Sequence, residues 1–285
     1  MNTFEKKIAV LSGKGGTGKT AFSVNLSLIL AKQGYSPLLA DLDVEEPNVH
    51  LFFKESFESE EPISLLFPSW NKDACNFCGL CASNCRFHSL AVFKDDFLFF
   101  QELCHSCGRC AAKCPRQALI EKPLQIGVLR KGNYGTLRLY EGRLDEGKTQ
   151  TSSMIREIKK QLPQTGLQIW DGPPGTSCPS LESVKGADLI VLITEPTPFG
   201  FHDFKLTVEA LKPFGIKTKV VVNKWVENNL EIELFCEKNN LTVLGKIPFS
   251  KQAAEAYSSG KSFWEFSDMR DFFLDMSEQI MEERE

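Results

Sequence analysis

A glycine-rich segment near the N-terminus has the residue types and the spacing of a phosphate-binding loop. It matches the Walker A pattern G-x-x-x-x-G-K-[ST] and reads Gly13-Lys14-Gly15-Gly16-Thr17-Gly18-Lys19-Thr20. Glycines let successive backbone N–H groups turn inward to cradle phosphate oxygens, and a helix starting near Lys19 adds the positive end of its dipole. We expect Lys19 to reach the terminal phosphates of ATP and the Thr20 hydroxyl to bind Mg²⁺. The alternative, a flexible glycine turn, is disfavoured by the strand and helix patterns on its two sides.

Eight of the ten cysteines fall into two short runs of identical spacing. Each run has the form C-x2-C-x2-C-x3-C, and Pro115 follows the second. Three thiolates at this spacing wrap three corners of a cubane within one loop, whereas the fourth cysteine reaches the other cluster. The spacing therefore predicts two 4Fe–4S clusters, the first held by Cys75, Cys78, Cys81 and Cys114, and the second by Cys104, Cys107, Cys110 and Cys85. Zinc is the main alternative, because paired C-x2-C motifs also bind it, but zinc has no use for the crossed fourth cysteine.

This cysteine-rich stretch, residues 71–122, resembles a bacterial-type dicluster ferredoxin. Arg86 stands where the first run of that family usually has proline, which questions the local turn but not cluster binding. The stretch also differs from strongly acidic free ferredoxins, because its five acidic residues are outnumbered by seven basic ones: Lys72, Arg86, Lys94, Arg109, Lys113, Arg116 and Lys122. We expect it to face acidic neighbours, either the segment 55–61 or an acidic protein redox partner.

The elements that must position the glycine loop follow from apolar periodicity. Residues 7–12 form a short apolar run before Gly13, and apolar residues recur at helical spacing from Thr20 to Lys32. Similar strand patterns lie at 37–40, 167–170, 189–194, 219–222 and 243–247, and helical patterns at 152–162, 201–211 and 230–239. Buried strands that alternate with helices indicate an α/β fold, with a mainly parallel P-loop NTPase sheet covered by helices on both faces.

The alternation breaks between residues 55 and 123, which we interpret as an insertion. Residues 55–70 are acidic and punctuated by proline, and residues 124–144 resemble short strands around the turn KGNYG, a possible hairpin between two modules. We therefore expect a first part of the ATPase domain at 1–70, a small inserted α+β ferredoxin-like domain at 71–122, and the second part of the ATPase domain at 123–285.

Composition excludes some classes of function. With 285 residues, 42% of them hydrophobic, and a net charge of −4, the chain has the composition of a globular protein and no basic patch for nucleic acid. It has no signal-peptide core and no apolar stretch of about 18 residues, so we expect a cytoplasmic protein. The C-terminal segment 262–285 is acidic rather than basic and amphipathic, which argues against direct attachment to a membrane.

Lys14 is not required by the Walker A pattern, and its presence gives the loop a resemblance to the MinD/ParA/Mrp class of ATPases, spelled K-G-G-x-G-K-[ST]. In that class this lysine reaches the phosphates bound by a partner subunit. The resemblance therefore implies that Lys14 acts in trans, in a homodimer or a heterodimer with a paralogous ATPase, bridged by nucleotide. A solvated lysine is the alternative.

The same resemblance assigns further residues to the nucleotide. Asp43, after the second strand, matches the aspartate that orients the attacking water, and Asp171, in a D-x-P-P-G-T segment, matches the Walker B aspartate that holds Mg²⁺ through water. Aspartates that merely cap loops are the alternative. Asn223 and Lys224 resemble the element that reads adenine, and the segment Gly245 to Pro248 would add backbone contacts to the base.

Two cysteines lie outside the two runs. Cys178 follows the P-P-G-T segment, at a position where the nitrogenase iron protein has a cluster ligand, but one cysteine per chain gives only two per dimer. We therefore expect Cys178 to be a small buried residue and Cys236 to be an ordinary packing residue.

These motifs support three hypotheses of function. The first is an ATPase whose nucleotide-dependent dimer cycle gates electron transfer through the two clusters. The second is an Mrp-type iron–sulfur cluster assembly or carrier protein, for which labile sites would be expected. The third is a MinD-like regulatory ATPase. The donor, the acceptor and the direction of electron flow are not predicted by the sequence.

Overall fold

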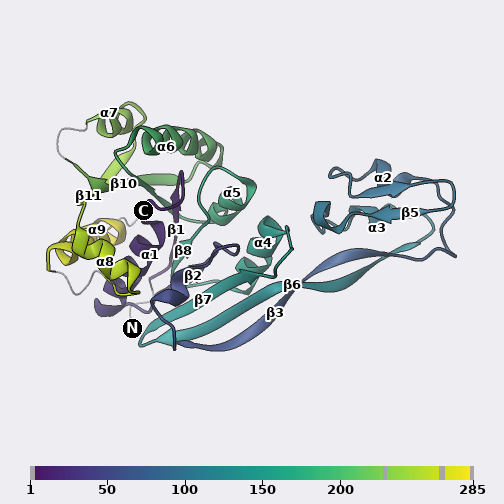
Figure 1. Ribbon diagram of the computed structural model, residues 1–285, viewed down its shortest axis with the longest axis horizontal. Helices are drawn as coiled ribbons and strands as arrows, with labels where there is room; N and C mark the ends of the chain where they lie inside the picture. Colours follow the sequence, from purple (N-terminus) through teal and green to yellow (C-terminus); the bar gives the residue numbers. More distant parts are fainter. Residues whose placement is uncertain (1–3, 227–229, 263–266, 283–285) are drawn as a thin grey trace.

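The computed structural model describes residues 4–226, 230–262 and 267–282. One nine-stranded sheet forms the body of the protein, in the order β11-β10-β9-β1-β8-β2-β7-β6-β3 (Figure 1). Its strands are β1 (Lys6–Ser12), β2 (Leu38–Asp41), β3 (Phe57–Trp70), β6 (Leu119–Tyr134), β7 (Leu137–Leu144), β8 (Leu167–Asp171), β9 (Leu189–Thr194), β10 (Lys217–Trp225) and β11 (Thr242–Pro248). From β11 to β7 all pairs are parallel, whereas β6 pairs antiparallel with both β7 and β3.

Helices cover both faces of the parallel part of this sheet, because its strands are apolar on both sides. On one face lie α1 (Lys19–Lys32), α8 (Lys251–Ser258) and α9 (Ser267–Met281), and on the other α4 (Thr151–Gln161), α5 (Cys178–Val184), α6 (Pro198–Leu211) and α7 (Glu231–Lys238). The predicted α/β class with a mainly parallel sheet is confirmed. In the described part of α9, Phe273 is buried, whereas residues 263–266 and 283–285 of the C-terminal segment lie outside the described residues.

The hairpin expected around the turn KGNYG is present, but the prediction of short strands is wrong. β6 has 16 residues and continues past the end of β7, because β3 pairs with it along nearly its whole length, from Leu119 to Gly132. β3 was not expected as a strand at all, since acidic residues and Pro62 and Pro68 obscure its pattern. Proline and charge suit β3 because it is the edge strand of the sheet, where one side needs no ladder partner.

The strands β3 and β6, here called the arm, carry the cysteine-rich module at their far end (Figure 1). Within the module, α2 (Leu80–Ser83), α3 (Arg109–Ala112) and the hairpin of β4 (Leu90–Val92) and β5 (Phe97–Phe99) surround a small apolar core. The buried face of the arm, with Ile63, Leu65 and Phe67, belongs instead to the main core that also contains Met154 of α4. The arm is therefore packed as part of the body of the protein and is not a free linker.

Three short 3-10 helices complete the described secondary structure, at Val49–Leu51, Gln101–Leu103 and Lys212–Phe214. Within the described residues, every helix is too short or too polar to cross a membrane.

Candidate functional site

The glycine loop connects β1 to α1 and lies against α6 and β10. A Cβ atom at Gly13 would lie 2.7 Å from the backbone carbon of Asp203, and one at Gly18 would lie 2.3 Å from the amide nitrogen of Asn223. Gly16 and Gly18 also have φ angles of 75° and 95°, in the left-handed region that favours glycine. Packing and backbone conformation therefore both require glycine in this loop.

Lys19 lies in a buried ring of carboxylates at the carboxyl ends of β2 and β8. Its Nζ is 3.1 Å from Oδ1 of Asp171 and 3.7 Å from Oδ2 of Asp43. Burial lowers the pKa of Lys19, but Asp171, Asp43 and Asp41 together outweigh burial, so that the pKa lies above its ordinary value. Lys19 is therefore a fixed positive charge where the predicted terminal phosphates would bind.

The two carboxylate oxygens of Asp171 differ in their hydrogen bonds to the described atoms. Oδ1 accepts hydrogen bonds from Lys19 and from the Ser23 hydroxyl at 3.0 Å, whereas the fully buried Oδ2 has no hydrogen-bond partner among the described atoms. A buried carboxylate oxygen without a partner is costly, and a metal-bound water is a suitable donor to it. Thr20 follows Lys19 in the first turn of α1. Thr20 and Asp171 offer the oxygen atoms that suit Mg²⁺, and their role stays a prediction.

Asp41, the last residue of β2, and Asp43, two residues later, have different environments. Asp41 accepts hydrogen bonds from the backbone N–H groups of Asp43, Asn48 and Val49 at 3.0, 2.9 and 3.0 Å, so it organises the loop. Asp43 instead directs its carboxylate at Lys19. Burial raises the pKa of Asp43 to about 6, against the opposing effect of Lys19. This geometry favours Asp43 over Asp41 as the water-orienting residue.

Lys14, expected to act in trans, is paired within its own chain. Its ammonium group contacts the Glu195 carboxylate, which is buried at the end of β9. Lys224 binds the other oxygen of Glu195 at 3.0 Å and donates to the Gly16 carbonyl at 3.0 Å. Burial raises the pKa of Glu195, but hydrogen bonds from Lys14 and Lys224 outweigh burial and lower it.

Glu195 was missed by sequence reasoning. The available signal was its position: like Asp171, it is an acidic residue at the carboxyl end of a buried parallel strand, at the edge of the sheet where ligands bind.

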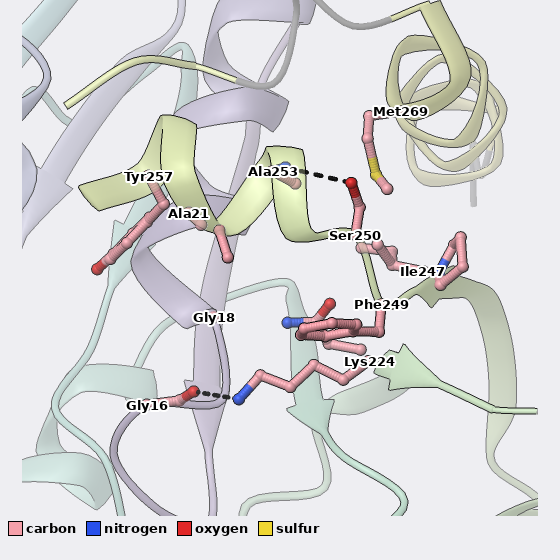
Figure 2. Close-up of a pocket in the computed structure, with 13 residues that line it drawn as sticks. Gly16, Gly18, Ala21, Lys224, Ile247, Phe249, Ser250, Ala253, Tyr257 and Met269 are labelled. Atoms are coloured by element: carbon pink, nitrogen blue, oxygen red, sulfur yellow. Dashed lines mark hydrogen bonds between the residues drawn. The ribbon is translucent and has the colours of Figure 1, made fainter. Parts of the chain in front are cut away.

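A pocket of about 260 Å³ lies beside the loop and gathers the residues predicted to contact adenine (Figure 2). Asn223, Lys224 and Pro248 line it, together with Gly16 and Gly18 of the loop. Asn223 donates from its amide to the Thr17 carbonyl at 2.6 Å, which joins the end of β10 to the loop. The apolar walls of this pocket were not predicted from the sequence. They come from α8, α9 and the segment before α8, with Ala253, Ala254, Tyr257, Met269 and Phe249.

The eight cysteines of the module line two separate hollows. The first, here the distal cup, contains Cys75, Cys78, Cys81 and Cys114 and lies against Trp70 and Leu119, at the outer end of the arm. The second, the proximal cup, contains Cys85, Cys104, Cys107 and Cys110 and lies against Leu66 and Pro68, closer to the body. The structure thus brings together the same four cysteines that the crossed spacing predicts for each cluster.

The two cups are built by an internal repeat of 29 residues. Phe77 and Ser106, and likewise Gly79 and Gly108, are equivalent positions that share positive φ angles. Backbone N–H groups donate hydrogen bonds to cysteine sulfur at equivalent positions of the repeat. The donors and acceptors are Phe77 to Cys75 and Ser106 to Cys104, both at 3.4 Å, and Ser89 to Cys85 at 3.4 Å and Ala118 to Cys114 at 3.2 Å. Such N–H groups stabilise thiolates, the form in which cysteine binds metal.

The thiols differ in how much their surroundings favour ionisation. Burial raises the pKa of Cys110 to about 11 and also raises the pKa values of Cys81 and Cys104. Burial acts in the same direction on Cys85, but hydrogen bonds from Ser89 and nearby backbone groups outweigh it and lower its pKa. Neutral buried thiols of this kind become ligands only with a metal charge to replace the proton.

Each cup is lined by four thiols, two of which accept hydrogen bonds from backbone N–H groups, and this arrangement fits a 4Fe–4S cluster. Within the described residues, no three His, Cys, Asp or Glu side chains are arranged to hold a single metal ion. The buried Ser106 hydroxyl at the proximal cup and the buried Trp70 indole N–H beside the distal cup also have no hydrogen-bond partner among the described atoms. The roles of the eight cysteines as ligands stay predictions.

The expectation that Cys178 is buried is wrong. It is exposed at the first residue of α5, because the buried face of this short helix is formed by Ser180, Ser183 and Val184. Cys236 is buried as expected, and burial raises its pKa to about 11.

A Walker A loop between the first strand and helix of a parallel sheet, with carboxylates at the ends of β2 and β8, defines a P-loop nucleotide-binding protein. The chain matches the family model of the CobQ/CobB/MinD/ParA nucleotide binding domain over residues 8–263. It therefore belongs to this family and is a P-loop ATPase of the MinD/ParA type.

The chain is similar in sequence to three relatives and in fold to one solved structure. It is 28% identical to an uncharacterized protein of Methanocaldococcus jannaschii over 96% of this chain and 97% of the relative. A second uncharacterized protein of that organism is 34% identical over 79% of this chain and 80% of the relative. An iron-sulfur cluster carrier protein of Pyrococcus furiosus is 55% identical over 47 residues, 16% of each chain. The septum site-determining protein MinD of Pyrococcus horikoshii, solved with Mg-ADP, has a similar fold, with a TM-score of 0.61 at 16% identity over 97% of this chain and 96% of that chain.

Proposed function

We propose that this ATPase uses a nucleotide-bridged dimer cycle to gate electron transfer through two 4Fe–4S clusters held by its inserted module. The observation that carries the proposal is the placement of Cys104. This thiol belongs to the proximal cup and also to the main apolar core of the ATPase body, which includes Met154 and Ile155 of α4. A cluster site built into that core would respond to movements of the body.

At the nucleotide, Lys19 would neutralise the terminal phosphates, and Thr20 with Asp171 would hold Mg²⁺, which supplies positive charge to the developing transition state. Asp43 would orient the attacking water once ionised. Asn223, Lys224 and Pro248 would contact the base beside the loop. Lys14 would have to leave Glu195 to reach a partner subunit, so its ion pair is that of a resting chain.

The dimer partner in this proposal is a second copy or a paralogous chain. The two relatives within one organism are compatible with either arrangement. The clusters would supply one-electron redox chemistry between this ATPase and a protein partner with an acidic surface, which the excess of basic residues in the module favours. A cytoplasmic location is part of the same proposal.

A cluster carrier is the second candidate, favoured by the similarity over 47 residues to a curated carrier protein and by the exposed thiols Cys78 and Cys107. Four ligands per cup from one chain, three of them within a short loop, argue for retention of the clusters rather than transfer.

The test is anaerobic purification, iron analysis and redox titration in the presence and absence of nucleotide. We expect about eight iron atoms per chain, reduction potentials that depend on nucleotide, and slow loss of iron to an apo-acceptor protein. Rapid transfer to the acceptor would favour the carrier. Iron far below this content, or zinc in its place, would contradict the dicluster assignment.

The role of the glycine loop is tested separately by substitution of its lysine. Lys19→Ala should abolish most ATP hydrolysis, and Lys212→Ala, which replaces an exposed lysine on the surface, is the matched control.

A further inference from the structure

The segment after β2 is held in contact with both the nucleotide site and α4. It contains Asp43, whose carboxylate lies 3.7 Å from the Lys19 ammonium group. Two residues later, Glu45 accepts a hydrogen bond from the Thr151 hydroxyl at 2.8 Å. Thr151 is the first residue of α4, and its side chain is buried. A displacement of Asp43 would therefore act directly on the N-terminal end of α4.

The same end of α4 holds the loop of the proximal cup. The Thr149 hydroxyl donates to the Glu102 carbonyl at 2.7 Å, and the Gln150 amide donates to the Gln101 carbonyl at 2.8 Å. The Ser153 hydroxyl donates to the His105 carbonyl at 3.3 Å. These carbonyls lie on both sides of Cys104, so three hydrogen bonds connect α4 to the backbone that carries a predicted cluster ligand.

A second connection joins the same segment to the inner end of the arm. His50 donates its backbone N–H to the Glu141 carboxylate at 3.0 Å, and its ring nitrogen lies 3.0 Å from the same oxygen. Glu141, on β7, is fully buried and accepts a hydrogen bond from Arg130 of β6 at 3.0 Å. Movement of the segment would thus act on the arm and on α4 together.

The distal cup is packed differently. Its cysteines Cys81 and Cys114 pack against the small core of the module, as Cys85 and Cys110 of the proximal cup also do. The difference is Cys104 of the proximal cup, which belongs to the core of the ATPase body, whereas none of the four described cysteines of the distal cup does. Among the described residues, the hydrogen bonds from the N-terminal end of α4 to the module end on the loop of the proximal cup, so a displacement of α4 would act on that cup first.

We infer that the proximal cup is the nucleotide-responsive cluster site, and that Glu45, Thr151 and the first turn of α4 are the positioning residues that connect it to ATP. This inference rests on the proposed gating function. The distal cup then has the role of the outer electron carrier, exposed to the redox partner through Cys78 and largely insensitive to nucleotide.

The test is a redox titration of the anaerobic holoprotein, followed by electron paramagnetic resonance, without nucleotide, with MgADP and with a non-hydrolysable MgATP analogue. We expect the oxidised-to-reduced ratio of one cluster to change about tenfold between the two nucleotides, or about 59 mV for a one-electron couple. The variants Cys78→Ser and Cys107→Ser, each altering the spectrum of its own cluster, assign the responsive signal. We expect it to be the signal that Cys107→Ser alters.

Thr151→Val removes the hydroxyl that binds Glu45. Thr218→Val is the matched control, since among the described residues that hydroxyl donates to the carbonyl of Ile216, just before β10 and away from the module. Thr151→Val should retain nucleotide binding and both clusters but lose most of the tenfold shift. As a second readout, amide hydrogen exchange of residues 101–105 should depend on nucleotide in the wild type and not in Thr151→Val.

The failures are distinguishable. If both clusters are present and neither potential responds to nucleotide, the gating function itself is wrong. If one responds but it is the distal cluster, or if the shift survives Thr151→Val unchanged, gating stands and the inferred route is wrong.

Discussion

At the scale of single residues, the site is organised by buried charges that compensate one another. Lys19 is balanced by Asp171 and Asp43, and Glu195 is balanced by Lys14 and Lys224. Buried charges are tolerated only with such partners, and removing one partner leaves the other uncompensated. Each pair is therefore a point at which binding of a charged nucleotide would change the balance.

The pKa of Asp43 predicts how ATP hydrolysis depends on pH. Since burial raises this pKa to about 6, the carboxylate is the minor form below that pH and the dominant form above it. If Asp43 must be ionised to orient water, kcat/KM should rise as pH increases from about 5 to 7, by roughly tenfold per unit on the acidic limb. The exposed Asp95→Asn should keep this profile. A flat profile over the same range would show that Asp43 does not control the step.

The pairing of Lys14 with Glu195 predicts a competition between two partners. Glu195→Gln weakens the ion pair within the chain, so Lys14 becomes more available to a second subunit. We expect dimerisation with a non-hydrolysable ATP analogue to tighten by about two- to five-fold, the range for a partly exposed ion pair. Sedimentation equilibrium measures the change, and Glu209→Gln, on the exposed face of α6, is the control. Weaker dimerisation would mean that Glu195 itself contributes to the dimer.

At the scale of elements, the arm is the feature that distinguishes this chain from a simple parallel sheet. It extends the sheet by two antiparallel strands whose inner face, with Ile63, Leu65 and Phe67, shares the core of the body. This arrangement gives the module a continuous apolar support.

Gly132 predicts where the arm is most sensitive to substitution. A Cβ atom there would lie 1.7 Å from the Ser56 carbonyl oxygen, so that Gly132→Ala must displace the start of β3. We expect the free energy of unfolding to fall by about 2 kcal/mol or more and the melting temperature to fall by roughly 5 °C. Ser64→Ala, at an exposed position of the same arm, should change it little. Limited proteolysis shows whether the arm is the part that loosens, and unchanged melting would contradict the tight packing at this position.

At the scale of the whole molecule, the cysteine-rich module enters and leaves the ATPase body through the two strands of the arm. Trp70 and Leu119 are paired across the end of the arm, so the chain can be closed there by a short turn without crossing the sheet.

Replacing residues 71–118 by Asn-Gly, which favours a two-residue hairpin turn, should give a chain that contains no iron but still binds nucleotide. We expect its affinity for MgADP to remain within about threefold of that of the intact protein, because the residues of the loop and pocket lie outside the excised segment. Calorimetry and iron analysis test this directly. A chain that folds but no longer binds nucleotide would show that the module is part of the nucleotide site.

The sequence by itself determined the local chemistry of this protein. The loop 13–20, the strand and helix around it and the crossed grouping of the cysteines could all be predicted, because each depends on residues close together in the chain or on a repeated spacing. The α/β class followed from the alternation of buried strands with helices.

Only the tertiary structure decided what depends on distant residues. Pairing of β3 with β6 could not be predicted, since its acidic and proline residues suit an edge strand whose partner lies far along the chain. The ion pair of Glu195 with Lys14 and the hydrogen bonds from α4 to the proximal cup likewise join segments remote in sequence. Such contacts are set by how elements pack, and it is this packing that connects the proximal cup through α4 to the segment beside the nucleotide loop.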